Sequence, residues 1–281
     1  MPLIPIERPD DPRLQPFRDL QHRGRNGEIA ATDQLFVVEG KFLTERLIRS
    51  DHELHSIVIE TGRELDALKD VPDSVPVFQI PSKAIRELVG FDFHRGVLAS
   101  GIRKPFHSID ELHLPDSDSS EVRLLLAAIG ISDKENLGSM LRTAAALGVN
   151  EIILGPGTVD PYSRRVMRVS MGTALVHRFY ELSEPEGSLQ SLIGRGFRVV
   201  ASTLDSDAAS IQTWRPDDRP VVLMVGNEAN GLPDRWQQSA SDRVRIPMKQ
   251  STDSLNVAVA AAILMHTCTQ SSRKHKSKSI E

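Results

Sequence analysis

Two stretches of the sequence place a charged side chain among small residues and glycines, a setting that suits chemistry on a bound ligand. In the first, Asp133–Gly148, the helical neighbours of Arg142 are small, so a ligand or another backbone can approach its guanidinium. In the second, Glu228 stands between Gly226 and Gly231, which permit positive φ or close approach of backbone. Taken alone, each stretch also fits a bland alternative: a solvated arginine, or a tight turn with a solvated glutamate.

A third stretch, Ile246–Cys268, runs from polar residues into a helical pattern that is apolar nearly all round, which predicts a buried helix. Ser254 and Asn256 stand at its start, where free backbone N–H groups favour an electron-rich ligand. Asp253 or Ser254 is expected to cap this helix, and Asn136 is expected to cap the helix that carries Arg142.

Strands must position these stretches, and the second half of the chain contains five candidates. They are Val122–Ala128, Glu151–Leu154, Arg198–Ala201, Val221–Val225 and Arg243–Ile246. Several are apolar on both faces and alternate with helical patterns, which predicts a parallel sheet covered on both sides. Ligands of such sheets bind at the carboxyl ends of the strands. The candidate residues follow strands, as this geometry requires.

The first half of the chain predicts a small α/β domain. Its strands are expected at Leu35–Val38, Ser56–Glu60, Val75–Ile80 and Gly96–Ser100. Helices are expected at Lys41–Ile48 and from Ser82, which serves as N-cap, to about Leu88. Residues 104–121 are rich in Pro, Ser and Asp and predict a linker. We therefore expect domains at 1–103 and 122–270, followed by a disordered basic tail at 271–281.

Composition restricts the class of protein. The chain has 281 residues, 40% of them hydrophobic and 26% charged, as in soluble globular proteins, and no apolar run approaches the ~20 residues that cross a bilayer. A single cysteine, Cys268, excludes an internal disulfide and fits a reducing compartment, so we expect a cytoplasmic protein. The net charge of −4 argues against a general nucleic-acid coat protein but leaves local RNA binding open.

Other enzyme classes lack their signatures. A dinucleotide-binding fold needs a glycine-rich turn after its first strand, and Gly130-Ile-Ser-Asp does not provide one. No G-x-S-x-G elbow of a hydrolase is present. A metal site on His266 and Cys268 would have no further ligands nearby, so no metal is expected.

Together and in this order, the three stretches resemble the SpoU/TrmH branch of the SPOUT RNA methyltransferases. The first pattern, N-x-G-x-x-x-R-T-A-x-x-x-G, is present as Asn136, Gly138, Arg142, Thr143, Ala144 and Gly148. The second, G-x-E-x-x-G-L, is present as Gly226, Glu228, Gly231 and Leu232. The third is matched by Ile246, Pro247, Met248, Ser254, Leu255, Asn256, Val257 and Ala260. Gln250 departs from the pattern, because glycine usually holds its place.

The resemblance implies a C-terminal SPOUT domain with a trefoil knot, and a homodimer with an active site shared between subunits. It implies S-adenosylmethionine as methyl donor and a ribose 2′-hydroxyl of RNA as acceptor. Carried over by position, the catalytic group consists of Arg142, Asn136, Glu228, Ser254 and Asn256. The cofactor group consists of Thr203, Gly226, Ile246, Met248 and Leu255. Whether Arg142 is a base or an electrostatic stabiliser stays open, although arginine keeps its proton in nearly every protein setting.

The substrate is expected to be RNA bound through a basic helix face. Arg164 and Arg168 are spaced i, i+4 with Arg165 beside them, and this face is expected to bind RNA phosphates, the alternative being a solvated or dimer-facing surface. The start Phe36-Val-Val-Glu-Gly40 resembles rRNA-modifying members, so rRNA is favoured over tRNA. The rival hypothesis is a noncatalytic RNA-binding or ribosome-assembly protein on the same fold, supported only by Gln250.

Overall fold

Two β-sheets organise the chain in the computed structural model, which describes residues 3–20, 34–114, 123–249 and 253–276. The chain divides into two compact units. One comprises Met1–Pro105 together with Asp160–Leu175, and the other comprises Phe106–Val159 together with Val176–Glu281. Gln250, residues 115–121 of the expected linker and residues 277–281 of the expected tail lie outside the described residues.

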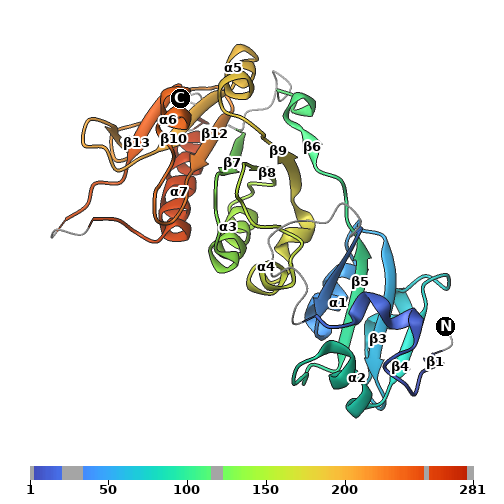
Figure 1. Cartoon of the computed structure of the whole chain (residues 1–281). Coiled ribbons are helices and arrows are strands. Elements are labelled where there is room, and N and C mark those ends of the chain that lie inside the picture. Colours follow the sequence, from blue (N-terminus) through green and yellow to red (C-terminus); the bar gives the residue numbers. More distant parts are fainter. Residues whose placement is uncertain (1–2, 21–33, 115–122, 250–252, 277–281) are drawn as a thin grey trace. The chain divides into compact units, whose positions relative to one another are not determined.

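The first unit contains a mixed five-stranded sheet. Its strands lie in the order β1 (Ile4–Pro5), β4 (Val77–Ile80), β3 (Leu54–Glu60), β5 (Val97–Ile102) and β2 (Leu35–Glu39). The first three are parallel, and β5 runs antiparallel to both of its neighbours. Helices α1 (Lys41–Ile48) and α2 (Ser82–Val89) and the 3₁₀ turns η1 (Pro12–Phe17) and η2 (Asp66–Asp70) complete this part (Figure 1). The predicted small α/β domain is thus present.

The predicted cap of α2 is wrong. Pro81 is the N-cap, with φ −61°, and Ser82 is the first helical residue. The Ser82 hydroxyl accepts a hydrogen bond from Arg86 Nη2 at 3.2 Å, instead of capping the helix backbone. With Pro81 as the cap, the helix begins one residue earlier than a Ser82 cap would place it.

Residues Asp160–Leu175, expected inside the C-terminal domain, group with the first unit. This segment contains α4 (Arg164–Val169) and most of η4 (Thr173–Val176). Arg164 forms an ion pair with Glu39, a carboxylate only 3% exposed, and its guanidinium lies 4.6 Å from the ring centroid of Phe91. Tyr162 OH lies 3.2 Å from Nε2 of the buried His52. These polar and aromatic contacts, which sequence periodicity cannot register, explain the grouping.

The second unit is built on an eight-stranded parallel sheet. Its order is β11 (Ala209–Ser210), β13 (Asp242–Arg245), β10 (Arg198–Ser202), β12 (Val221–Val225), β7 (Leu124–Ala128), β8 (Glu151–Leu154), β9 (Arg178–Glu181) and β6 (His107–Ser108). All neighbouring strands are parallel, as predicted. The prediction missed β9, which begins and ends on charged residues, and the two-residue edge strands β6 and β11.

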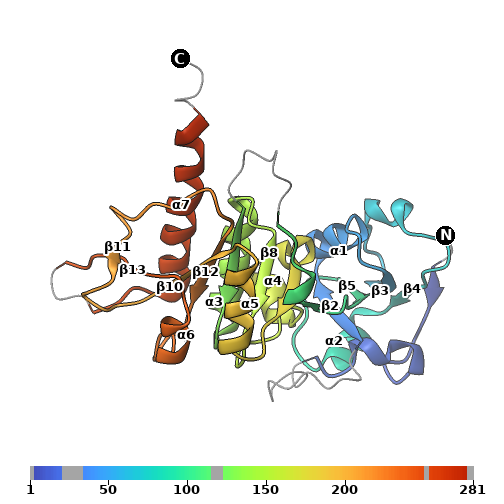
Figure 2. The same ribbon diagram turned by 90° about the horizontal axis from the view of Figure 1, so that it is seen from above.

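Helices cover both faces of this sheet. On one face, Leu125 and Met224 pack in a cluster with Leu192 of α5 (Glu186–Gly194) and Trp236 of α6 (Asp234–Gln238). Successive residues of a strand point to opposite faces of the sheet. The alternate residues of β7 and β12, which point to the other face, are also buried, so that face is covered too. On the other face, α7 (Val257–Lys276) contacts β7 and β12 and runs along α3 (Lys134–Ala146) (Figures 1 and 2).

The predicted helix caps on this face are both wrong. The side chain of Asp133, not Asn136, accepts from backbone N–H groups at the start of α3, at 2.5 Å from Glu135 N and 3.3 Å from Asn136 N. Asn256, not Asp253 or Ser254, caps α7, because its Oδ1 accepts from the N–H of Ala258 at 2.9 Å. A cap depends on which side chain reaches the free N–H groups, and several polar residues competed at each start.

The far end of α7 also differs from expectation. The helix continues to Lys276, six residues into the stretch expected to be a disordered tail. It is not buried all round either, since Val259 is 49% and Ile263 is 38% exposed. No helix among the described residues is long and apolar enough to span a membrane. The trefoil knot implied by the resemblance stays a prediction.

Replacing Arg164 with alanine tests the attachment of α4. Among the described residues, the buried Glu39 carboxylate would then keep Arg95 as its one cationic partner, whose Nε lies 4.0 Å away. We expect the free energy of unfolding to fall by about 2–3 kcal/mol, somewhat less than the loss of the sole partner of a buried charge. Urea unfolding measures this. Arg168→Ala, at a partly exposed position of the same helix, is the matched control and should change stability by less than about 0.5 kcal/mol. Equal stability of the two variants would contradict the assignment.

Candidate active site at the carboxyl end of the parallel sheet

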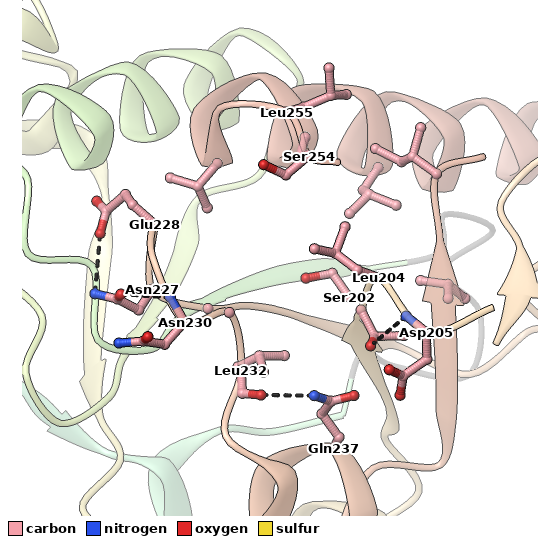
Figure 3. Close-up of a pocket in the computed structure, with 18 of the residues that line it drawn as sticks. Ser202, Leu204, Asp205, Asn227, Glu228, Asn230, Leu232, Gln237, Ser254 and Leu255 are labelled. Carbon is pink, nitrogen blue, oxygen red and sulfur yellow. Dashed lines mark hydrogen bonds between the residues drawn. The ribbon is translucent and has the colours of Figure 1, made fainter. Parts of the chain in front are cut away.

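A cavity of about 310 Å³ lies at the carboxyl ends of the adjacent strands β13, β10 and β12 (Figure 3). Its volume falls in the range of small-molecule sites. The five residues predicted to hold a cofactor all line it: Thr203, Gly226, Ile246, Met248 and Leu255. Glu228 and Ser254, from the predicted catalytic group, line it too. Segments 202–205, 226–232 and 244–264 therefore meet at the cavity, where the sheet geometry predicted a ligand site.

The turn that follows β12 depends on glycine. A Cβ added to Gly226 would lie 2.2 Å from the backbone nitrogen of Leu232, so no larger residue fits there. Asn227 and Gly231 exchange two backbone hydrogen bonds, at 3.0 and 2.9 Å, and Gly231 has φ +65°. The Asn227 side chain accepts from Ala229 N–H at 2.9 Å and donates to the carbonyl of Gly130 at 2.8 Å. It thereby fixes the turn and links it to the turn after β7.

The Glu228 carboxylate is the centre of a hydrogen-bond network. Its Oε1 accepts from the N–H of Asp133 at 3.2 Å and from Asn136 Nδ2 at 3.0 Å. Its Oε2 accepts from the N–H and the hydroxyl of Ser132, both at 3.4 Å. Both oxygens are therefore held by the segment between β7 and α3.

Asn136 and Asn256 extend this network to α7. Asn256 Nδ2 donates to Asn136 Oδ1 at 2.9 Å, while Asn136 Nδ2 donates to Glu228. The same Asn256 caps α7 through its Oδ1. Three of the five predicted catalytic residues thus form one chain of hydrogen bonds, Asn256 to Asn136 to Glu228. An amide can relay in this way because it donates and accepts at once.

The network also sets the charge of Glu228. Burial by itself raises the pKa of this carboxyl. Hydrogen bonds from Asn136 and from the backbone N–H groups of Glu228, Asp133 and Ser132 together outweigh burial and hold the pKa below its ordinary value. The site therefore presents an ionised carboxylate at neutral pH.

Arg142, the remaining predicted catalytic residue, lies apart from the cavity wall. It is on the exposed side of α3, six residues after Asn136, which puts it on a different face of the helix. Among the described residues its guanidinium has no hydrogen-bond or ion-pair partner. The guanidinium of Arg142 is thus exposed and available to an anionic ligand.

The three predicted RNA-binding arginines, Arg164, Arg165 and Arg168, lie on α4 in the first unit. Arg164 is half-buried and committed to Glu39. Arg165 is exposed and Arg168 is partly exposed. Arg165 and Arg168 are therefore accessible at the surface, whereas Arg164 is engaged within its own unit.

Gln237 and Asp205 are among the cavity residues that the sequence analysis missed. Gln237, on α6, donates from Nε2 to the Leu232 carbonyl at 2.8 Å, and its Oε1 is buried without a partner among the described residues. Asp205 follows β10 and pairs with Arg243 Nη1 at 2.8 Å. Asp205 stands four residues after the predicted strand Arg198–Ala201, which was a usable signal. The role of Gln237 depends on where α6 packs, which the sequence does not indicate.

The lining of the cavity favours a ligand that is partly apolar and carries positive charge. Leu204, Leu232, Val244, Val257, Ala260 and Leu264 supply apolar surface. Its charged side chains, among the described residues, are Asp205 and Glu228, with no lysine or arginine. In Figure 3, Glu228 and Asp205 lie at opposite ends of the cavity, and Ser254 and Leu255 lie across it from Gln237.

The sequence motif at His266 and Cys268 does not make a second site. Burial raises the pKa of the Cys268 thiol to about 12, so it stays neutral and unreactive. Within the described ranges, no group of three or more His, Cys, Asp or Glu side chains is arranged to hold a metal ion.

Comparison with known proteins points to one group of enzymes. Residues 123–266 match the SpoU rRNA Methylase family. A tRNA/rRNA methyltransferase of Mycobacterium bovis, itself described as uncharacterized, is 34% identical over 94% of this chain and 90% of its own length. The 23S rRNA (guanosine(2553)-2'-O)-methyltransferase RlmP of Bacillus subtilis is 24% identical over 82% of this chain and 87% of its own. The AdoMet-bound rRNA methyltransferase structure from Sinorhizobium meliloti, 24% identical, superposes with a TM-score of 0.77 over 97% of this chain and 98% of the other.

Glu228→Gln tests the charged network through pH. Because the folded-state pKa of Glu228 is depressed, its contribution to stability is present above the ordinary glutamate pKa and is lost as the pH falls through the lowered value. The variant should have a lower free energy of unfolding than the parent at pH 7. The difference between the two should become smaller as the pH falls from about 5 to about 3. Urea midpoints across this range measure it. Glu53→Gln, at an exposed position, should show little difference at any pH. A gap for Glu228→Gln that does not change with pH would contradict this assignment.

Proposed function

Because the chain belongs to the SpoU rRNA methylase family, we propose that it transfers a methyl group from S-adenosylmethionine to a ribose 2′-hydroxyl of RNA. The observation that carries the proposal is that the second and third motif stretches line one cavity. The first stretch is joined to them by the hydrogen bonds from Asn256 to Asn136 and from Asn136 to Glu228. The 2′-O-ribose specificity rests on similarity to RlmP. The same similarity favours rRNA over tRNA, and we place the activity in the cytoplasm.

The cavity fits S-adenosylmethionine. The donor carries a positive sulfonium and a flat adenine, and the cavity offers two carboxylates on a wall that is partly apolar and partly polar. The buried Gln237 Oε1 needs a hydrogen-bond donor that a ligand can supply. Thr203, Gly226, Ile246, Met248 and Leu255 would hold the cofactor.

When bound, the sulfonium supplies an activated methyl group with a good leaving group, so the protein needs chiefly to align and stabilise. Glu228, held by Ser132, Asp133 and Asn136, keeps the turn after β12 in place beside the cofactor pocket. Ser254 and Asn256 position the start of α7 on the other side. Alignment of the ribose oxygen with the methyl group is the main contribution that these residues make.

Arg142 is assigned to the RNA. Its guanidinium fixes the phosphate beside the target ribose and stabilises negative charge that develops on the 2′-oxygen. Its exposed position away from the cavity favours a site completed across a homodimer. The exposed Val259 and Ile263, spaced i, i+4 on α7, offer an apolar stripe for that interface.

The first experiment measures methyl transfer directly. Purified protein, tritiated S-adenosylmethionine and rRNA from cells that lack the protein should give label in 2′-O-methyl nucleotides, which resist alkaline hydrolysis. In Arg142→Ala, transfer should fall at least about 100-fold, as for other groups that stabilise developing charge. Calorimetric affinity for S-adenosylhomocysteine should stay unchanged, because Arg142 is outside the cavity.

Arg142→Lys is the matched control, and it should recover part of the rate, since lysine keeps the charge but not the planar fork. Full activity of Arg142→Ala would exclude the assigned role. If the parent chain bound no cofactor at millimolar concentration, the noncatalytic alternative would stand instead.

The RNA-binding face of α4 is tested by salt titration. The double variant Arg165→Ala/Arg168→Ala should weaken RNA binding. It should also reduce the slope of log Kd against log salt concentration by about one to two, because about one counterion fewer is released on binding for each phosphate contact that is lost. Fluorescence anisotropy with labelled rRNA measures both. Arg8→Ala, an exposed arginine of the same unit, should leave the slope intact. An unchanged slope in the double variant would remove α4 from the interface.

A further inference from the structure

Two large apolar side chains of the first unit are exposed and share one neighbour. Phe42, on α1, is 51% exposed, and Met171, just after α4, is 39% exposed (Figure 1). Arg46 contacts both, since its guanidinium lies 5.2 Å from the centroid of the Phe42 ring and its Nη1 donates to the Met171 carbonyl at 2.5 Å. We call these three residues the Phe42 platform.

The platform is built rigidly. Met171 has φ +54°, a left-handed conformation that residues other than glycine rarely adopt. Gly172 follows with φ +75°, and a Cβ there would lie 2.9 Å from Arg46 Cδ and 3.0 Å from Leu43 Cδ2. This close approach presents the Met171 carbonyl to Arg46. The guanidinium is thereby held over the aromatic ring instead of moving freely in solvent.

The charge of the platform is positive. Lys41, on the same helix, is balanced by Glu45 at 3.9 Å and Asp66 at 3.6 Å. Arg46, in contrast, has a neutral carbonyl as its partner and no carboxylate partner among the described residues. An exposed aromatic ring beside an uncompensated guanidinium suits a flat, electron-rich ligand attached to an anion.

The platform also adjoins the helix assigned to RNA phosphates. Met171 N–H donates to the carbonyl of Arg168 at 3.1 Å, so the platform begins where α4 ends. Proteins that bind single-stranded nucleic acid combine such features, with cations along the backbone and aromatic or guanidinium planes on which bases stack.

We propose that the Phe42 platform stacks an unpaired base of the RNA substrate. This inference rests on the proposed function, because it assumes that RNA is bound. If the proposal holds, the RNA that contacts the first unit is single-stranded, for example in a loop or a bulge, because both faces of a base inside a duplex are stacked on its neighbours. Phe42 supplies the stacking surface, and Arg46 orients the ring and contributes charge.

The test compares two RNA probes on the full chain. A labelled 12-nucleotide single strand of mixed sequence and the corresponding duplex are titrated at several salt concentrations. The parent should prefer the single strand. Phe42→Ala should bind it about tenfold more weakly, near the lower end of the effect of losing one base stack, while Phe42→Trp should bind as well as the parent. The loss should be equal at every salt concentration, unlike the loss in the α4 variants, because stacking releases no counterions.

Leu3→Ala, which removes another exposed apolar side chain of the same unit, is the control and should leave affinity unchanged. Phe42→Ala should also unfold at the parent's temperature, since the side chain is half exposed. Unchanged affinity of Phe42→Ala, or an equal loss for single strand and duplex, would overturn the proposal. So would a change in oligomeric state on gel filtration, which would assign the platform to a protein contact. Absence of any RNA binding by the parent would instead count against the proposed function itself.

Discussion

The Glu228 carboxylate holds the proposed active site together. It accepts hydrogen bonds from the backbone after β7 and from Asn136 on α3, which lies 92 residues earlier in the chain. Asn136 in turn accepts from Asn256, the cap of α7. One negative charge therefore fixes two helix starts and one turn relative to each other. Because the carboxylate stays ionised, these contacts are charge-assisted and stronger than bonds between neutral groups.

The parallel sheet explains why such an arrangement arises. Its strands all end at the same edge, so segments far apart in the chain are brought side by side without contacts of their own. The turn after β12 can close there because Gly226 packs directly against the backbone of Gly231 and Leu232. The cavity thus combines apolar side chains with the acidic side chains of Asp205 and Glu228.

Hydrophobic periodicity and the positions of strand ends were enough to predict the parallel sheet and the location of the cavity. The continuous apolar runs at Leu124–Ala128 and Val221–Val225 indicated the sheet, and the residues after them indicated the cavity. The predictions of helix caps were wrong, because several polar residues near a helix start can serve as its cap. Asn136 was expected to cap α3, but Asp133 does so. The Asn136 side chain therefore reaches Glu228 instead. Prediction missed Gln237, and it did not foresee that α4 packs with β2, because such pairings arise only from tertiary structure.

The backbone passes between the two units three times, at Pro105, at Val159 and again at Leu175. The first unit is therefore not a detachable module. A truncated chain that began after residue 105 would keep Tyr162 and Arg164 but lose Phe36, His52 and Glu39, the groups that cover and neutralise them. Any exchange of the first unit between related chains would have to transplant both pieces at once.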